Sequence, residues 1–405
     1  MLTPRDGGGG LISVRNLLAV VMVALSGCAS PRLPPLPLAL ASETNPFDIP
    51  NARYYPDTDG KRLEALGRIS IERERRAIVG KAPTSQLPPA NFLAISGGGD
   101  NGAFGAGLLC GWSERGDRPK FRLVTGVSTG ALSAPFVFLG SDYDHALRQV
   151  FTATEASDVF EPRKVMIAAI SADALTDSAP LRGMISRFLD RQMLSRIAEE
   201  YSKGRLLLIM TTNLDQGRPV IWDIGAIAAS GHPKAREFII DILMASAAIP
   251  GLFPPVMLDV SHGGMEYQEM HVDGGTTAQA FLYPPTFDLN RMAGQNRVNR
   301  ERVAYIVRNG RLFREEADVQ RQTLSVATEA ASAMIAANGT NDTFRIYLTT
   351  KRDGVGYNLA YIDDDFTEPY KGPFDRAYMN KLFEYGYDLG RKGYQWHKAP
   401  PGFGE

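Results

Sequence analysis

The stretch FRLVTGVSTGALSAPFVFL, residues 121–139, changes its hydrophobic pattern in the middle. Its first seven residues form a short apolar run rich in β-branched side chains, which is typical of a buried strand. The residues from 129 to 139 are mostly apolar and small, and they predict a buried helix. Between the two lies Gly126-Val127-Ser128-Thr129-Gly130, where the flanking glycines permit a sharp turn that presents the serine hydroxyl. The stretch therefore predicts a strand, a tight turn and a helix.

The same alternation of strand and helix continues along the chain. Expected strands are 92–95, 121–127, 205–212, 219–224, 302–308 and 344–350, and expected helices are 102–115, 129–139, 234–248, 322–338 and 376–393. Continuous apolar strands between helices predict an α/β fold whose mainly parallel sheet is covered on both faces. Segments 141–200 and 283–300 fit this alternation poorly, and we expect them to be insertions or lids.

Composition excludes several classes of function. The 405 residues are 44% hydrophobic and 22% charged, with a net charge of −1, which gives no support to a nucleic-acid partner. Two cysteines cannot form a disulfide framework, and together with five histidines they form no cluster at metal-ligand spacing. We therefore expect neither a metal site nor a nucleic-acid partner.

The first 28 residues have the pattern of a secretory signal peptide. Arg5 and Arg15 precede an apolar run over 17–25 that is too short to span a bilayer. The run ends in Leu-Ser-Gly-Cys, which resembles the lipobox of bacterial lipoproteins. That resemblance implies export to the cell envelope and a membrane anchor on a lipidated Cys28.

The remaining chain divides into three parts by composition. Residues 29–90 combine a proline-rich stretch, expected to be an extended tether, with a charged amphipathic helix. We expect the catalytic domain over 91–393 and a polar C-terminal tail over 394–405. Cys110 lies in an apolar, small-residue segment, which predicts a buried and unreactive thiol.

A nucleophilic serine needs hydrogen-bond donors for the oxyanion that its attack creates. Gly97-Gly98-Gly99 follows the first expected strand, and the helix opening near Gly102 adds its positive dipole end. The same glycines also satisfy G-x-G-x-x-G, which would cradle a dinucleotide phosphate. That motif requires an acidic residue at the end of the next strand, whereas Asp117 lies in the turn before it. The pattern favours an oxyanion loop.

Two residues compete as the base that activates the serine. An α/β-hydrolase would use a late histidine, here His397, but its serine turn normally follows several strands and its glycine loop reads H-G-G-G. Asp273 in HVDGG ends an apolar run and precedes Gly274 and Gly275. By itself an Asp-Gly pair indicates only a turn.

The order G-G-G-x-x-G, G-x-S-x-G and D-G-G resembles that of the patatin-like phospholipase family, and so does ASAAIPGLFPP at 245–255. The resemblance covers residues 92 to about 280. It implies a three-layer α/β/α sandwich and a Ser–Asp dyad that hydrolyses acyl esters of membrane lipids without a cofactor. It makes Ser128 the nucleophile and Asp273 the base, with Gly97, Gly98 and Gly99 as the oxyanion loop.

The resemblance has two departures next to the glycines. Many family members carry arginine or lysine where this chain has Asn101, so recognition of a charged phosphate headgroup lacks that cation. Asp100 places a carboxylate beside the loop, which opposes an oxyanion unless its side chain points away. Two alternatives therefore stay open: an esterase or acyltransferase for other esters, and a non-catalytic surface lipoprotein that binds a partner.

Overall fold

The structure is a computed structural model that describes residues 32–78, 87–159, 161–162, 176–296, 298–312, 321 and 323–403. The expected signal peptide and Cys28 lie outside these residues. Within them, no helix is long and apolar enough to cross a membrane. Nor do the described histidine, cysteine, aspartate and glutamate side chains form a group that could hold a metal ion.

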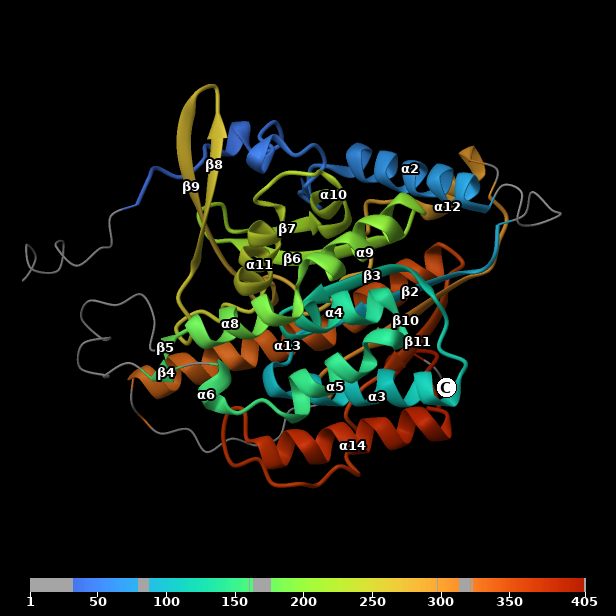
Figure 1. Cartoon of the computed structure of the whole chain (residues 1–405). Coiled ribbons are helices and arrows are strands. Elements are labelled where there is room, and N and C mark those ends of the chain that lie inside the picture. Colours follow the sequence, from blue (N-terminus) through green and yellow to red (C-terminus); the bar gives the residue numbers. More distant parts are fainter. Residues whose placement is uncertain are drawn as a thin grey trace, which may run out of the picture.

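A nine-stranded mixed sheet forms the centre of the described part of the chain (Figure 1). Its strands are β1 (Arg53–Tyr54), β2 (Ala90–Ile95), β3 (Phe121–Val127), β6 (Leu206–Asn213), β7 (Arg218–Asp223), β8 (Val256–His262), β9 (Met265–Asp273), β10 (Arg302–Val307) and β11 (Gly356–Ala360). The order is β1-β7-β6-β3-β2-β10-β11, with the β8–β9 hairpin attached to β6. Five neighbouring strands in this order are mutually parallel, namely β6, β3, β2, β10 and β11. The strands β1, β7, β8 and β9 pair antiparallel.

Helices cover both faces of this sheet. They are α2 (Gly60–Ile78), α3 (Gly102–Arg115), α4 (Thr129–Leu139), α5 (Asp144–Thr152), α6 (Ala156–Val159), α8 (Ala179–Phe188), α9 (Arg191–Ser202), α10 (Ile224–Ala229), α11 (Ala235–Ser246), α12 (Leu289–Gln295), α13 (Thr323–Arg352) and α14 (Arg376–Lys392). Figure 1 shows α2 and α12 on one side of the sheet and α3, α5 and α14 on the other. The short strands β4 (Glu161–Pro162) and β5 (Thr176–Asp177) form a separate ribbon.

The two faces follow from the alternation of side chains along each strand. On β2, Leu93 and Ile95 join the core cluster that contains α3, α4 and α14, while Phe92 and Ala94 join the cluster beneath α2 and α12. Strands buried on both faces carry apolar residues at nearly every position, which explains the continuous apolar runs in the sequence. The α/β fold with a mainly parallel sheet is confirmed.

One expected strand is wrong. Residues 344–350 belong to α13, and the strand beside β10 is β11, which begins at Gly356. Within this segment Ile346 and Thr350 are buried, and the preceding Thr343 is buried as well, so burial recurs every three to four residues. That period is helical, and packing of this stripe on the sheet overrides the β propensity of FRIYLTT.

The proline-rich stretch is also different from the expected extended tether. From Arg32 onward it packs against the domain, with Leu36, Ile49 and Tyr55 each at most 3% exposed. Its strand β1 pairs with β7. Apolar side chains between the prolines supply a buried surface, which composition alone concealed. The charged helix of the same region is confirmed as α2.

The C-terminal tail likewise packs on the domain. The ring of Trp396 lies 5.0 Å from the rings of both Trp112 and Tyr305. The backbone of His397 pairs with Leu359 of β11. The tail therefore covers the edge strand of the sheet.

Candidate active site

Strands β3 and β9 end head to head along the same edge of β6. In the parallel ladder Val127, the last residue of β3, lies opposite Met210 of β6. In the antiparallel ladder Asp273, the last residue of β9, lies opposite Thr211, the next residue of β6. Because β9 takes over the edge of β6 where β3 stops, the residue after β3 meets the residue that ends β9. Ser128 and Asp273 are brought together by this arrangement.

Ser128 stands at the turn between β3 and α4 in a strained backbone conformation, with φ 53° and ψ −124°. Positive φ is costly for a serine, so neighbouring contacts must hold the turn. The Ser128 amide donates to Ser246 Oγ at 3.0 Å, and Ser246 Oγ donates to the Met210 carbonyl at 2.7 Å. Ser246, the last residue of α11, thereby fastens the turn to β6.

The two predicted catalytic side chains form a buried hydrogen-bonded pair. Ser128 Oγ donates to Asp273 Oδ2 at 2.6 Å, and the Gly275 amide donates to Asp273 Oδ1 at 2.6 Å. The two residues are only 5% and 4% exposed. Burial raises the pKa of Asp273 to about 7, and the two neutral donors counter this only in part. A carboxylate with this pKa is a far better proton acceptor at neutral pH than an exposed aspartate.

The glycine loop lies directly beside this pair. A Cβ placed on Gly97 would be 3.1 Å from Ser128 Cβ. The Gly97 amide already donates to the Gln279 carbonyl at 2.9 Å, so it is committed to the fold. The amides of Gly98 and Gly99 have no hydrogen-bond partner among the described residues. The expectation of three free donors is therefore reduced to two.

Asn309 lies just beyond the end of β10 and packs against the glycine loop. Its amide N–H donates to Ser96 Oγ at 2.8 Å and its Nδ2 donates to the Ser96 carbonyl at 2.9 Å. Its Oδ1 accepts from the Gly105 amide of α3 at 3.1 Å. A Cβ on Gly98 would lie 2.0 Å from the Asn309 carbonyl oxygen, so this close approach requires glycine.

The remaining motif glycines permit close packing between elements. A Cβ would lie within 2.5 Å of a neighbouring atom at each of Gly102, Gly126, Gly130 and Gly274. For Gly130 that atom is the carbonyl oxygen of Ile95, which shows how closely α4 approaches the end of β2. The spacing G-x-S-x-G is thus a steric requirement of the strand-to-helix turn.

The two departures beside the glycines both face the C-terminal segment. Asp100 Oδ2 accepts from the Phe374 amide at 3.0 Å, and the Tyr370 hydroxyl also bonds this carboxylate. Asn101 Oδ1 accepts from the Tyr378 hydroxyl at 3.0 Å. The Asp100 carboxylate is therefore held by the C-terminal segment and by the backbone of residues 100 and 101, and burial raises its pKa.

The alternative base is in the wrong place. His397 stacks on Tyr361 with ring centroids 4.8 Å apart, next to the edge strand β11 and three strands away from β3. Cys110 is buried in α3, and burial raises the pKa of its thiol to about 12, which makes it a poor nucleophile.

Three residues of the site had not been singled out from the sequence: Ser246, Asn309 and Gln279. Two signals could have found them. Asn309 follows a parallel strand and therefore lies at the same sheet edge as the glycine loop. Ser246 and Gln279 are polar residues inside apolar runs, where a polar side chain needs a partner.

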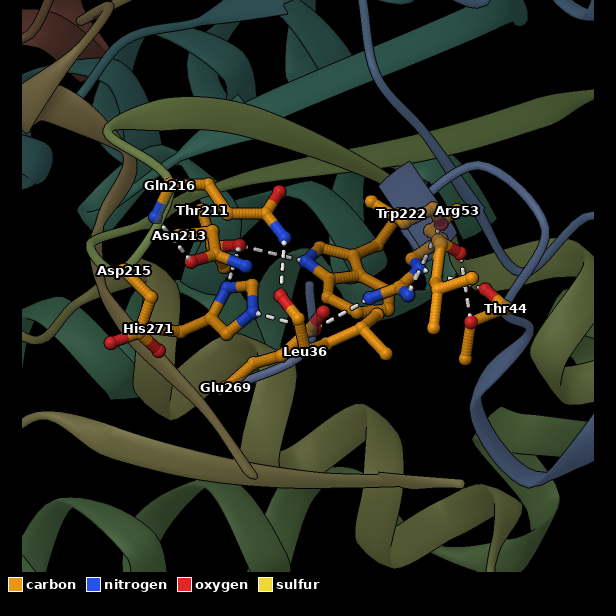
Figure 2. A network of polar contacts seen from close by, with 12 residues as sticks. Leu36, Thr44, Arg53, Thr211, Asn213, Asp215, Gln216, Trp222, Glu269 and His271 are labelled. Carbon is orange, nitrogen blue, oxygen red and sulfur yellow. Dashed lines mark hydrogen bonds and ion pairs between the residues drawn. The ribbon is translucent and has the colours of Figure 1, made fainter. Parts of the chain in front are cut away.

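A second buried network lies farther along β9 (Figure 2). Arg53 of the N-terminal segment forms an ion pair with Glu269 at 2.5 Å, and Glu269 accepts from His271 Nε2 at 3.3 Å. His271 Nδ1 contacts Thr211 Oγ1 at 2.9 Å, which also accepts from Trp222 Nε1 at 2.8 Å. Both ring nitrogens of His271 are engaged, so it is not available to Ser128. The network ties the N-terminal segment to the strand that carries Asp273.

Comparison with known proteins shows what this chain is similar to. No curated protein sequence matches this chain. VipD from Legionella pneumophila matches structurally with 14% identity and a TM-score of 0.38, over 75% of this chain and 66% of that one. Human GIVD cytosolic phospholipase A2 in complex with methyl gamma-linolenyl fluorophosphonate matches with 9% identity and a TM-score of 0.28, over 84% and 64%.

This chain spans slightly less than two thirds of each of those two chains, and such low TM-scores support no functional assignment. The sequence itself is more informative. Residues 93–284 match the family model described as patatin-like phospholipase, and this range contains the glycine loop, Ser128 and Asp273. Over residues 93–284 the chain is therefore similar to the patatin-like phospholipase family.

Proposed function

We propose that this protein hydrolyses carboxylic esters of lipids through an acyl-enzyme on Ser128. The observation that carries the proposal is the buried hydrogen bond from Ser128 Oγ to Asp273 Oδ2 at 2.6 Å. A serine at a strained turn, bonded to a carboxylate whose pKa is near neutral, has the geometry of an activated nucleophile. The family match over the same residues supports a lipid ester as the substrate.

In the acylation step Ser128 Oγ attacks the ester carbonyl carbon while Asp273 accepts the hydroxyl proton. The amides of Gly98 and Gly99 donate to the resulting oxyanion, and each donor lowers the barrier by about 3 kcal/mol. The tetrahedral intermediate collapses by breaking the bond to the alcohol oxygen. That oxygen takes the proton from Asp273 and leaves as the free alcohol or lysolipid.

In the deacylation step water attacks the acyl carbon and gives its proton to Asp273. The bond from the acyl carbon to Ser128 Oγ then breaks, the proton returns to Ser128, and the fatty acid is released. No cofactor takes part in either step. The expected lipid anchor at Cys28 fits this proposal because it would hold the domain at an interface rich in substrate; metabolic labelling with palmitate tests it.

The experiment compares the full chain in detergent with its Ser128→Ala variant. Fatty-acid release is measured from phosphatidylcholine vesicles, from monoacylglycerol micelles and from p-nitrophenyl butyrate. We expect Ser128→Ala to lose at least about 1,000-fold in activity on every ester that the protein cleaves, because the nucleophile is removed.

The substrates separate the alternatives. Serine-dependent release from vesicles supports a phospholipase despite Asn101. Turnover of the uncharged esters alone supports an esterase without headgroup recognition. Equal rates for the protein and Ser128→Ala on all three substrates would contradict the proposal and favour a binding role.

A further inference from the structure

Gln279 joins the two loops that carry the chemistry. It follows the short 3-10 turn Gly274–Thr276 that succeeds Asp273, and it is only 7% exposed. Its carbonyl oxygen accepts from the Gly97 amide of the glycine loop at 2.9 Å. The backbone of Gln279 therefore connects the loop after the base to the loop of oxyanion donors.

The side-chain carboxamide lies between the same two loops. A Cβ on Gly97 would be 2.3 Å from Gln279 Oε1 and 3.1 Å from Ser128 Cβ. A Cβ on Gly275 would be 2.3 Å from Gln279 Nε2 and 3.0 Å from Asp273 Oδ1. The amide thus adjoins the nucleophile at one end and the base at the other, and it explains why both positions are glycine.

This carboxamide has unused hydrogen-bonding capacity. Neither Oε1 nor Nε2 of Gln279 has a hydrogen-bond partner among the described residues, although the side chain is more than nine-tenths buried. Neither atom is fully enclosed by protein, so the amide keeps some contact with solvent and can bind a water molecule. The group is placed to bind something that enters beside Ser128 and Asp273.

We propose that Gln279 is a positioning residue for the water that hydrolyses the acyl-enzyme; this role rests on the proposed function. The water must donate one hydrogen to Asp273 while its oxygen approaches the acyl carbon on Ser128. The amide of Gln279 borders both groups and offers an acceptor oxygen and an NH₂ group with two donor hydrogens. Its Oε1, which lies on the side of Gly97 and Ser128, can therefore accept the second hydrogen of the water.

The step that Gln279 assists is deacylation. A bond forms between the water oxygen and the acyl carbon, the proton passes to Asp273, and the bond to Ser128 Oγ breaks with return of that proton. Gln279 gains or loses no proton. Acylation needs no water, and its oxyanion already meets the free amides of Gly98 and Gly99. The role therefore predicts a selective effect on the second half of the reaction.

The test uses the full chain in detergent with Gln279→Met, which keeps the side-chain volume and removes both polar atoms. Rapid mixing with p-nitrophenyl butyrate separates the burst of p-nitrophenol, which reports acylation, from the steady state, which reports deacylation. We expect acylation within about threefold of the unsubstituted protein. Deacylation should be slower by roughly 30-fold, because a misplaced nucleophile costs up to about 100-fold.

Methanol provides a readout that a packing role would not change. It can give its single hydrogen to Asp273 and has none left for Gln279, so methanolysis depends less on the amide than hydrolysis does. We expect Gln279→Met to raise the ratio of methyl butyrate to butyric acid about tenfold, in line with the slower attack by water. The matched control is Gln216→Met, because Gln216 lies at the second network and donates to the Leu36 carbonyl. That variant should leave both rates and the ratio unchanged.

A second variant guards against a folding defect. Gln279→Glu keeps the shape but adds a carboxylate beside Asp273, so it should slow deacylation and shift the pH profile of activity to higher pH. Equal slowing of both steps, or an unchanged methanol ratio in both variants, would overturn the role of Gln279 while leaving the function of Ser128 intact. A burst that persists in Ser128→Ala would overturn the proposed function and this role with it.

Discussion

Two buried carboxylates stand four residues apart on β9, and their environments are opposite. Glu269 and Asp273 lie on the same face of the strand and are 0% and 4% exposed. Burial alone would raise the pKa of Glu269, but the bond from His271 and the charge of Arg53 outweigh it and lower that pKa. Among the described residues, the Asp273 carboxylate accepts hydrogen bonds from the neutral donors Ser128 and Gly275, and burial raises its pKa to about 7.

The difference separates a carboxylate suited to a structural role from one suited to act as a base. A carboxylate with a cationic partner stays ionised and is a weak base, so it can hold two segments together but cannot take a proton at neutral pH. A carboxylate kept in a low-dielectric site without a cation retains basicity, at a cost in stability. On this strand the partner, and not the extent of burial, decides the role.

The largest expected effect is the loss of activity when Asp273 is replaced. Asp273→Asn keeps the shape but cannot accept the Ser128 proton, so we expect kcat/KM to fall about 10,000-fold, as when a catalytic carboxylate is replaced by its amide. Its stability at pH 8 should rise. The folded pKa of Asp273 lies above its unfolded value, so ionisation between about pH 4 and 7 destabilises the fold, and asparagine removes that penalty.

Ester hydrolysis and urea denaturation at pH 8 measure the two quantities. More than a tenth of the original activity in Asp273→Asn would show that another group accepts the proton. If Asp273→Asn were less stable than the unsubstituted protein, the fold would stabilise the charge of Asp273, and the contrast with Glu269 would disappear.

The second effect is on stability at Arg53. Arg53→Met leaves the buried Glu269 carboxylate without its cationic partner. Breaking a buried ion pair in this way lowers the free energy of unfolding by about 3–5 kcal/mol. Arg53→Met combined with Glu269→Leu should recover much of the loss, because no uncompensated charge remains. Because the folded pKa of Glu269 is lowered, its stabilisation is present above its unfolded pKa and is lost as pH falls through the folded pKa.

Thermal and urea unfolding from pH 3 to 8 test this. Arg196→Met is the control, because Arg196 pairs with Asp142 at 3.8 Å on the surface and such pairs contribute less than about 1 kcal/mol. Equal losses for Arg53→Met and Arg196→Met would mean that the buried network does not fasten the N-terminal segment.

The smallest effect is the pH dependence of the unsubstituted protein. Asp273 acts as base only when ionised, so kcat/KM should fall about tenfold per pH unit below its pKa of about 7 and level off above it. Initial rates with an uncharged ester from pH 5 to 9 give the profile. A rate that stays constant down to pH 5 would show that the pKa of the base is not raised and would remove its contrast with Glu269.

Local signals predicted much of the fold. The expected strand over 121–127 and helix over 129–139 match β3 and α4, because apolar periodicity and glycine position act within a few residues. The failures were non-local. Residues 344–350 form part of a helix because their buried stripe meets the sheet at helical spacing, and residues 32–59 pack because β7 offers them an edge.

By itself, the sequence determined an α/β fold with a serine at a strand-to-helix turn, since periodicity and the G-x-S-x-G spacing are local constraints. It also presented Asp273, although only the resemblance to a family distinguished that residue from an ordinary turn. Tertiary structure decided what the serine meets: β9 replaces β3 on the edge of β6 and brings together two residues 145 positions apart. It also decided that Asp273 lacks a cation while Glu269 has one, because the pKa of a buried group depends on neighbours that the fold supplies.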